Sequence, residues 1–190
     1  TFHFPTKEHM LAELVDILCK YQGKIMEDES KDGRSSIMTK CLELLTIASA
    51  CEQDKVAKDF FLSSYRSELC MDHIRKNDKE RAKEVFKEYC LDWTDEDFAE
   101  AESLVSGIEY ATLLTTSEST SLEARVGGAL KTILSIYNVP KEIRDQKVHK
   151  VLSMDYKTIG LDTLRKFREY VDEVTEQTFL DLVKRKQTAE

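Results

Sequence analysis

The sequence predicts one all-α domain, a multi-helix bundle of about eight helices with a long C-terminal helix. The chain of 190 residues has only six glycines and two prolines, fewer turn-forming residues than a protein built of β-sheets needs. Hydrophobic residues make up 41% and charged residues 34%, and the apolar residues recur at helical spacing. A domain of about this length buries roughly 70% of its unfolded surface, so residues 1–190 can form a single domain, ordered from about residue 6 to about residue 186.

The first predicted helix follows Thr6, whose hydroxyl can accept a hydrogen bond from the first turn. Its apolar residues share one face: Met10, Leu11, Leu14, Leu18 and Tyr21. Residues 27–33 are charged and end in glycine, which indicates an exposed connection. The second helix, over residues 35–51, is apolar around most of its circumference, so we expect it at the centre of the core.

The middle of the chain predicts two further helices. The first runs from Asp54 to Ile74, with a bend at residues 63–64. Asn77 and Glu80 then have the spacing of a capping box, in which each side chain bonds a backbone N–H at the start of a helix. A short helix is therefore expected to begin at Asn77.

The spacing of a capping box recurs at Thr94 and Asp97, where acidic residues also suit the positive end of a helix dipole. A polar loop is expected over residues 115–121, and the helix after it contains Gly127 and Gly128. Each glycine costs a helix about 1 kcal/mol relative to alanine. We therefore expect either a kink or a close backbone approach at these two residues.

The last two predicted helices are separated by a break over residues 153–160. The first of them begins at Pro140, because proline suits the first turn of a helix. The C-terminal helix is expected to span about 24 residues, roughly twice the average length. Its apolar residues are spaced by three, four and three: Leu164, Phe167, Val171 and Val174. A long terminal helix with such a face is typical of packing against a second chain.

Charge and cysteine content exclude several classes of function. The net charge of -8 argues against direct contact with nucleic acid, since phosphate binding normally needs a basic surface. No apolar run approaches the roughly 20 residues that span a bilayer, and no signal segment is recognised, so we expect no membrane partner. The chain starts at Thr1 and not at a methionine, which suggests a piece of a longer protein. An odd number of widely spaced cysteines indicates a reducing, intracellular compartment: Cys19, Cys41, Cys51, Cys70 and Cys90.

No pattern of metal-binding or catalytic residues is recognised. Cys70 and His73 lie one helical turn apart, but a zinc site needs a second pair nearby. None of the histidines has a glutamate three residues before it, as a di-iron carboxylate bundle requires. The acidic run over residues 92–100 lacks the glycine and the spacing of a calcium loop. We therefore expect no enzyme activity, no cofactor and no metal.

Two stretches carry a resemblance to a known family. Residues 154–159 read Met-Asp-Tyr-Lys-Thr-Ile and lead into the long terminal helix. Residues 74–86 predict a helix, a short Lys-Asn turn and an alanine-containing helix. Both stretches resemble the TRF homology domain, which dimerises vertebrate telomere-repeat-binding factors. The matching apolar residues of the terminal helix are Leu164, Phe167, Val171 and Leu182.

The chain departs from this family at two places. Met154 and Ile159 stand where aromatic residues are usual, and residues 51–64 contain no Leu-Thr-Pro-Leu-like segment of the kind found near the family's peptide-docking groove. The resemblance implies an all-α fold and homodimerisation through the first two helices and the last. It also implies a nuclear, telomeric protein whose DNA-binding module lies outside this chain.

The leading hypothesis is a non-enzymatic helical domain for homodimerisation and protein docking, in a telomere- or chromatin-associated protein. The apolar face of the terminal helix could equally pack on the second helix of its own chain. The residues expected at the interface with a second copy or another protein are Met10, Leu14, Leu18, Leu164, Phe167, Val171 and Val174.

Two alternatives stay open. One is a monomeric helical adaptor, or a viral structural or regulatory protein, with a cytoplasmic location. The other is an all-α nucleotide hydrolase that uses magnesium, and its carboxylates would have to face a cleft. Those carboxylates would be Glu169, Asp172, Glu173 and Glu176.

Overall fold

Eight helices make up the described part of the chain, in which no strand is found. The computed structural model describes residues 6–30, 36–115 and 120–187. The prediction of an all-α fold with a long C-terminal helix is therefore confirmed. The helices are α1 (Lys7–Ser30), α2 (Ile37–Gln53), α3 (Lys55–Arg66), α4 (Glu68–Val85), α5 (Asp95–Leu114), α6 (Leu122–Ile136), α7 (Lys141–Leu152) and α8 (Tyr156–Gln187).

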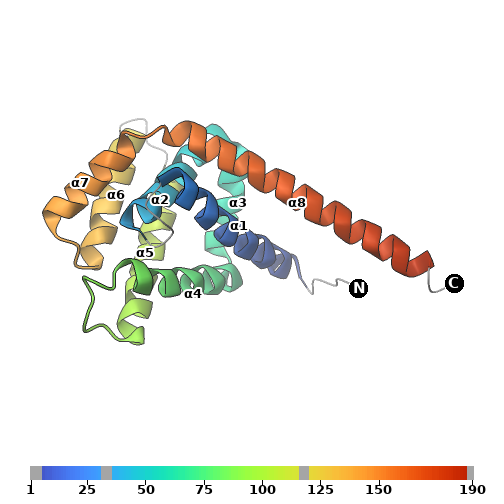
Figure 1. The fold of residues 1–190 in the computed structure, drawn as a ribbon, viewed down its shortest axis with the longest axis horizontal. Helices are drawn as coiled ribbons and strands as arrows, with labels where there is room; N and C mark the ends of the chain where they lie inside the picture. Colours follow the sequence, from blue (N-terminus) through green and yellow to red (C-terminus); the bar gives the residue numbers. More distant parts are fainter. Residues whose placement is uncertain (1–5, 31–35, 116–119, 188–190) are drawn as a thin grey trace.

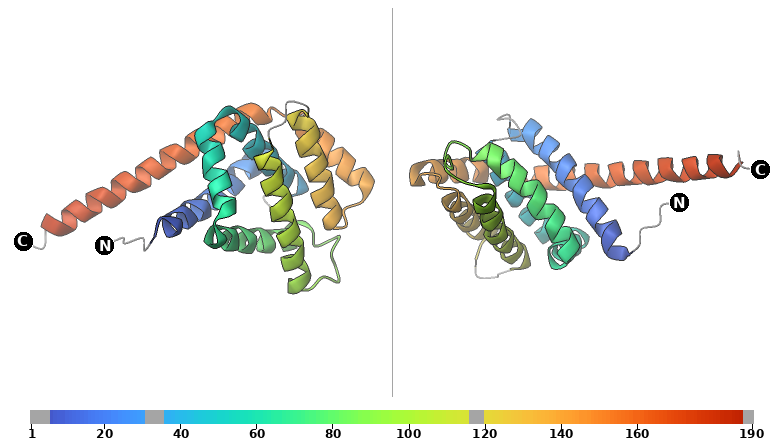
Figure 2. Two further views of the ribbon diagram at one scale, coloured as in Figure 1. Left: turned by 180° about the vertical axis from the view of Figure 1, so that it is seen from behind. Right: turned by 90° about the horizontal axis from the view of Figure 1, so that it is seen from below.

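The first seven helices form the body of the domain, and α8 crosses this body and continues beyond it as a rod (Figure 1). The views from behind and from below show the same projection (Figure 2). Within the body, α2 contacts α1, α3, α5, α6, α7 and α8. The domain is thus built around α2, and α8 lies directly on it.

The central position of α2 follows from its sequence, as predicted. The side chains of Cys41, Leu42 and Leu45 are completely buried, and burying a leucine stabilises a fold by about 1.5–3 kcal/mol. Thr46 is also buried, and its hydroxyl donates to the carbonyl oxygen of Leu42 at 2.8 Å. A polar group inside the core is tolerated there because its hydrogen bond is made within the helix.

The backbones of α2 and α8 come close at Gly160. A Cβ atom at this position would lie 2.7 Å from the carbonyl oxygen of Thr46, closer than real Cβ contacts. Glycine is therefore what allows the N-terminal part of α8 to pack on α2 without a gap. Gly127 and Gly128 differ from the prediction, because α6 is continuous through both. A Cβ added at Gly127 would make only ordinary contacts, and one added at Gly128 would meet nothing within 4 Å.

Local hydrogen bonds fix where several helices begin. The predicted capping box at Thr94 is present: the Thr94 hydroxyl accepts from the Asp97 N–H, and the Asp97 carboxylate accepts from the Thr94 N–H at 2.6 Å. Caps of this kind stabilise a helix by about 1 kcal/mol. Other side chains that accept from the first turn are Ser36, Asp54, Ser67 and Ser121.

The predicted start of a short helix at Asn77 is wrong, because α4 runs without a break from Glu68 to Val85. The Asn77 side chain is used elsewhere: its Nδ2 donates to Oδ1 of Asp16 in α1 at 2.9 Å. The break before α4 falls at Ser67, close to the bend predicted at residues 63–64.

Two other boundaries differ from the prediction. Residues 27–30 of the predicted connection belong to α1, since glutamate and aspartate do not interrupt a helix that is already formed. Residues 31–33 of the predicted connection lie outside the described part. The helix α8 has 32 residues instead of about 24, because it begins at Tyr156 inside the expected break. The predicted loop at residues 115–121 includes residues 116–119, which are also outside the described part.

Candidate interaction surface

The first half of α8 is held by α1, α2 and α3. The ring of Tyr170 stacks on Tyr21 of α1 with centroids 5.3 Å apart, and the ring of Phe167 lies 6.3 Å from Phe60 of α3. Arg168 also donates to Oδ2 of Asp54, between α2 and α3, at 2.5 Å. These contacts hold α8 on the body up to the region of Val171.

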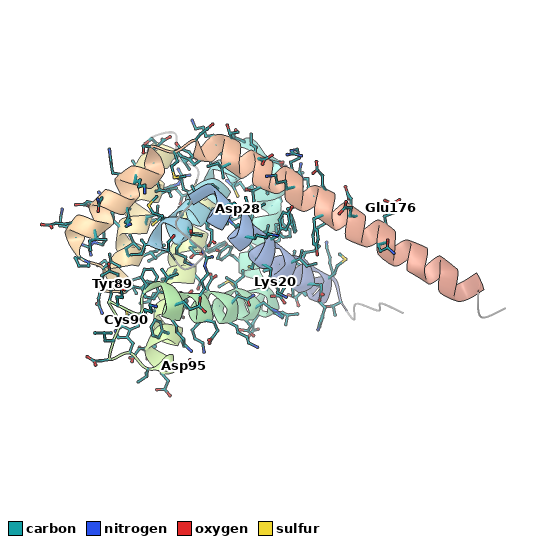
Figure 3. All side chains as sticks on the ribbon, viewed as in Figure 1. Lys20, Asp28, Tyr89, Cys90, Asp95 and Glu176 are labelled. Carbon is teal, nitrogen blue, oxygen red and sulfur yellow. The ribbon has the colours of Figure 1, made fainter. Side chains whose placement is uncertain are left out.

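Beyond this region α8 leaves the body. Gln187 lies 16 residues after Val171 (187 minus 171), which at 1.5 Å per residue corresponds to roughly 24 Å of helix. Glu176 lies on this projecting part and is exposed (Figure 3). Isolated helices of this length are marginal in water, so a projecting helix is expected to gain stability from packing against another surface.

A surface groove is lined by residues of α1 and α3. In Figure 1, the ribbons of these two helices lie on the side of the body from which α8 projects. The volume of the groove is about 620 Å³. Met10 is 43% exposed and Val56 is 69% exposed, so the groove leaves apolar surface from two helices open to solvent in one place. Polar residues surround this apolar floor, as at many protein interaction sites. The apolar lining consists of Met10, Leu11, Leu14, Val56 and Phe60.

The structure divides the predicted interface residues of α1 into two groups. Met10 and Leu14 line the groove, and Leu14 is half-buried. Leu18 differs from the expectation, because only 4% of it is exposed and it belongs to the core of this chain. The available part of the α1 face is therefore its N-terminal part.

The predicted residues of α8 are divided in the same way. Phe167 is 9% exposed and packs in the core of this chain, so it is not free for a partner. Leu164 and Val171 are half-buried against the same core. The backbone of Val174 is part of α8, but its side chain lies outside the described residues. Helical spacing predicts which residues share an apolar face, but it does not say whether the chain itself covers that face.

Val56 of the groove was not among the predicted residues. It lies in the first turn of α3, two residues after the capping residue Asp54. Its spacing of four residues from Phe60 places both on one side of α3, which is a sequence signal for a shared apolar surface.

The carboxylates of the hydrolase hypothesis are all exposed: Glu169, Asp172, Glu173 and Glu176. Glu169 accepts from Arg165 at 2.8 Å, an ordinary ion pair on a helix surface. Arg168, which lies four residues before Asp172, bonds Asp54. The four carboxylates thus lie on the exposed surface of α8, whereas the hydrolase hypothesis expected them to face a cleft.

The described residues contain no group of three or more histidine, cysteine and acidic side chains that could hold a metal ion. Cys70 is fully buried, while His73 is half-buried with its Nδ1 2.9 Å from Oδ2 of Asp16. Burial raises the pKa of the Cys41 and Cys51 thiols to about 12. These thiols therefore stay protonated and unreactive in the folded domain.

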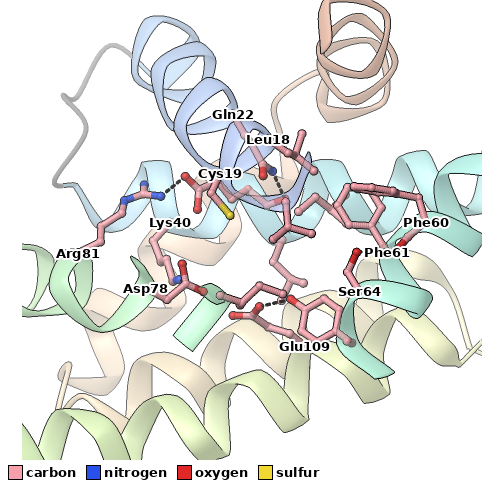
Figure 4. A pocket seen from close by; sticks show the side chains of 16 residues that line it. Leu18, Cys19, Gln22, Lys40, Phe60, Phe61, Ser64, Asp78, Arg81 and Glu109 are labelled. Atoms are coloured by element: carbon pink, nitrogen blue, oxygen red, sulfur yellow. Dashed lines mark hydrogen bonds and ion pairs between the residues drawn. The ribbon is translucent and has the colours of Figure 1, made fainter. Parts of the chain in front are cut away.

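A second polar region lies inside the body, around a cavity of about 80 Å³ between α1, α2, α3, α4 and α5 (Figure 4). Lys40 and Glu109 line it, and both are 8% exposed. Sequence analysis did not identify these residues, because charged side chains usually lie on the surface. The available signal was that Glu102 and Glu109 occupy the same side of α5 as the apolar residues Phe98 and Val105.

Comparison with known proteins gives no relatives for this chain. No protein-family model matches it, and no curated protein or solved structure matches it significantly. Across the described residues, no helix is both long and apolar enough to cross a bilayer.

Proposed function

We propose that this chain is a non-enzymatic domain for homodimerisation and protein docking. The observation that carries this proposal is the projecting half of α8, which extends beyond the body next to the groove between α1 and α3 (Figure 1). In a two-fold dimer, the projecting helix of each copy would pack on the other copy. The exposed side chains of Met10 and Val56 would then become buried.

We further propose that the domain belongs to a telomere- or chromatin-associated protein. This part of the proposal is supported by the resemblance of residues 74–86 and 154–159 to the TRF homology domain. Residues 156–159 of the second segment form the first turn of the long terminal helix α8. The net charge of -8 agrees with a DNA-binding module outside this chain and with no direct DNA contact by this domain.

Sedimentation of the purified chain tests the dimer. We expect a dimer at micromolar concentration that dissociates in the variant Met10→Glu, because the new charge would be buried at the interface. The matched control is Leu91→Glu, since Leu91 is 82% exposed in the connection between α4 and α5, away from the projecting end of α8 (Figure 1). A wild-type chain that is strictly monomeric at high micromolar concentration would overturn the proposal.

A monomeric adaptor is the second candidate, because the same apolar groove could accept a segment of another protein. The sedimentation experiment separates the two candidates. A monomer whose groove still binds another protein, with loss of binding in Met10→Glu, would favour the adaptor.

A further inference from the structure

Around Lys40, acidic side chains outnumber basic ones among the residues that the structure describes. Glu102 is 1% exposed and Glu109 is 8% exposed, and both belong to α5. The acidic groups of this interior are Glu43, Asp78, Glu102 and Glu109, and the basic ones are Lys40 and Arg81. If every one of these groups were ionised, the interior would carry a net charge of -2 (two positive and four negative).

The two basic groups are engaged by the acidic groups of α2 and α4. Arg81 forms an ion pair with Glu43, and Nζ of Lys40 lies 3.6 Å from Oδ2 of Asp78. Figure 4 shows Lys40 beside Asp78. Burial acts against the charge on Lys40, but the neighbouring carboxylates, Asp78 first, outweigh it and raise its pKa. For the acid Glu43 the effect of burial is the reverse: burial raises its pKa, and Arg81 opposes this shift.

Glu102 and Glu109 are bonded by neutral tyrosines instead. Tyr137 donates to Oε1 of Glu102, and Tyr65 donates to Oε2 of Glu109 at 2.5 Å. The two glutamates lie seven residues apart, which is two turns along one side of α5. A buried carboxylate with only a neutral donor is costly in its charged form, so the protonated form is favoured.

Five other cations on the helices packed against α5 bond groups other than Glu102 and Glu109. From α4, Arg75 donates to the Ser106 hydroxyl, and Lys79 and Lys83 pair with Asp95. From α3, Arg66 donates to the Tyr110 hydroxyl. From α6, Arg125 donates to the Thr112 carbonyl oxygen and to Glu52. Lys40 is thus the cation that acts on both glutamates.

We propose that Glu102 and Glu109 form a proton-binding pair that couples the packing of α5 to pH. Each would hold a proton in the folded domain under conditions in which the unfolded chain has lost it. The cavity beside Glu109 exceeds the roughly 10–15 Å³ that one water molecule needs, so this glutamate can exchange its proton with solvent. The pair therefore makes the stability of the domain depend on pH.

The direction of this dependence follows from the pKa values. Burial raises the pKa of both glutamates from 4.5 to about 7, against the opposing effect of Lys40. Because the folded-state pKa is the higher one, the contribution to stability is complete below 4.5 and is lost as the pH rises to about 7. In this window each glutamate lowers the ratio of folded to unfolded chain by about tenfold per pH unit.

Urea unfolding of the full chain at several pH values between about 5 and 8 tests the proposal, since a pH slope reports the difference in bound protons. The variants are Glu102→Gln and Glu109→Gln, in which an uncharged amide replaces the protonated acid. In the wild type, each glutamate is expected to contribute a change of about tenfold in the ratio of folded to unfolded chain per pH unit. We expect each variant to lack this contribution, so that its slope is smaller than the wild-type slope by that amount. The matched control is Glu100→Gln, an exposed position on the same helix, which should keep the wild-type slope.

Equal slopes for the wild type and both variants would overturn the proposal. If a variant does not fold, the wild-type chain still gives an answer through the carbon-13 resonances of its glutamate carboxyl groups. Two glutamates should then titrate near pH 7. Titration of every glutamate below about pH 5, as in model peptides, would equally refute it.

Discussion

The close approach of α8 to α2 makes Gly160→Ala an informative substitution. The added Cβ would lie 2.7 Å from the carbonyl oxygen of Thr46 and 3.4 Å from its carbonyl carbon. These atoms belong to the backbone of the central helix, so they cannot rotate away as a side chain would. We therefore expect α8 to be displaced by several tenths of an ångström, at a cost of about 1–3 kcal/mol for overpacking.

An opposite effect must be subtracted from this cost. Replacing glycine by alanine in a helix stabilises it by about 1 kcal/mol through backbone entropy. The net change at Gly160 should thus lie between about 0 and 2 kcal/mol of destabilisation. Gly128→Ala is the matched control, because Gly128 lies inside α6 with nothing within 4 Å of the added atom. It should stabilise the domain by about 1 kcal/mol.

Urea unfolding monitored by circular dichroism measures both free energies of unfolding. We expect the two variants to change stability in opposite directions, with a difference of about 1–3 kcal/mol between them. If the proposed dimer forms, sedimentation of Gly160→Ala should in addition show weaker dimerisation, because the projecting part of α8 moves with its base. If Gly160→Ala stabilises the domain as much as Gly128→Ala does, the close packing of α8 on α2 is refuted.

Two further predictions concern the backbone and the thiols. Asn138 has a φ of 59° and lies just after Tyr137, the residue that caps the end of α6. Asn138→Gly should therefore preserve or raise the thermal midpoint, whereas Asn138→Ala should destabilise the domain by about 1 kcal/mol. Equal midpoints for the two variants would contradict this. Burial raises the pKa of the Cys90 thiol to about 11, and that of the Cys41 and Cys51 thiols to about 12. At neutral pH, a thiol-specific reagent should therefore label these cysteines no faster than the domain unfolds at the same urea concentration. Rapid labelling of the native chain would refute their burial.

Elements governed by local interactions could be predicted from the sequence. The capping box of Thr94 and Asp97 joins residues three apart in the chain. The helix α2 is apolar around most of its circumference, which by itself indicates that it is buried. Asn77 has the same local spacing, but its side chain bonds Asp16, which lies 61 residues earlier in the chain. A tertiary hydrogen bond of this kind leaves no mark in a short sequence pattern.

The candidate surface was predictable only in part for the same reason. Helical spacing placed Met10, Leu18 and Phe167 on apolar faces, but only the folded chain shows that Leu18 and Phe167 are covered and Met10 is not. The burial of Glu102 and Glu109 in α5 was not predicted, because the sequence alone does not distinguish a buried charged residue on an apolar helix face from an exposed one. Their surroundings are set by Lys40, by Tyr65 of α3 and by Tyr137, which follows the last residue of α6.

The carboxylate of Asp54 links two helices that the sequence keeps far apart. It caps α3 by accepting from the Val56 and Ala57 N–H groups, and it also accepts from Arg168 of α8. If α8 tilted on the body, Arg168 would pull on the residue that anchors the first turn of α3. The base of the rod and the first turn of α3, which carries Val56 of the groove, therefore share one carboxylate as a common anchor.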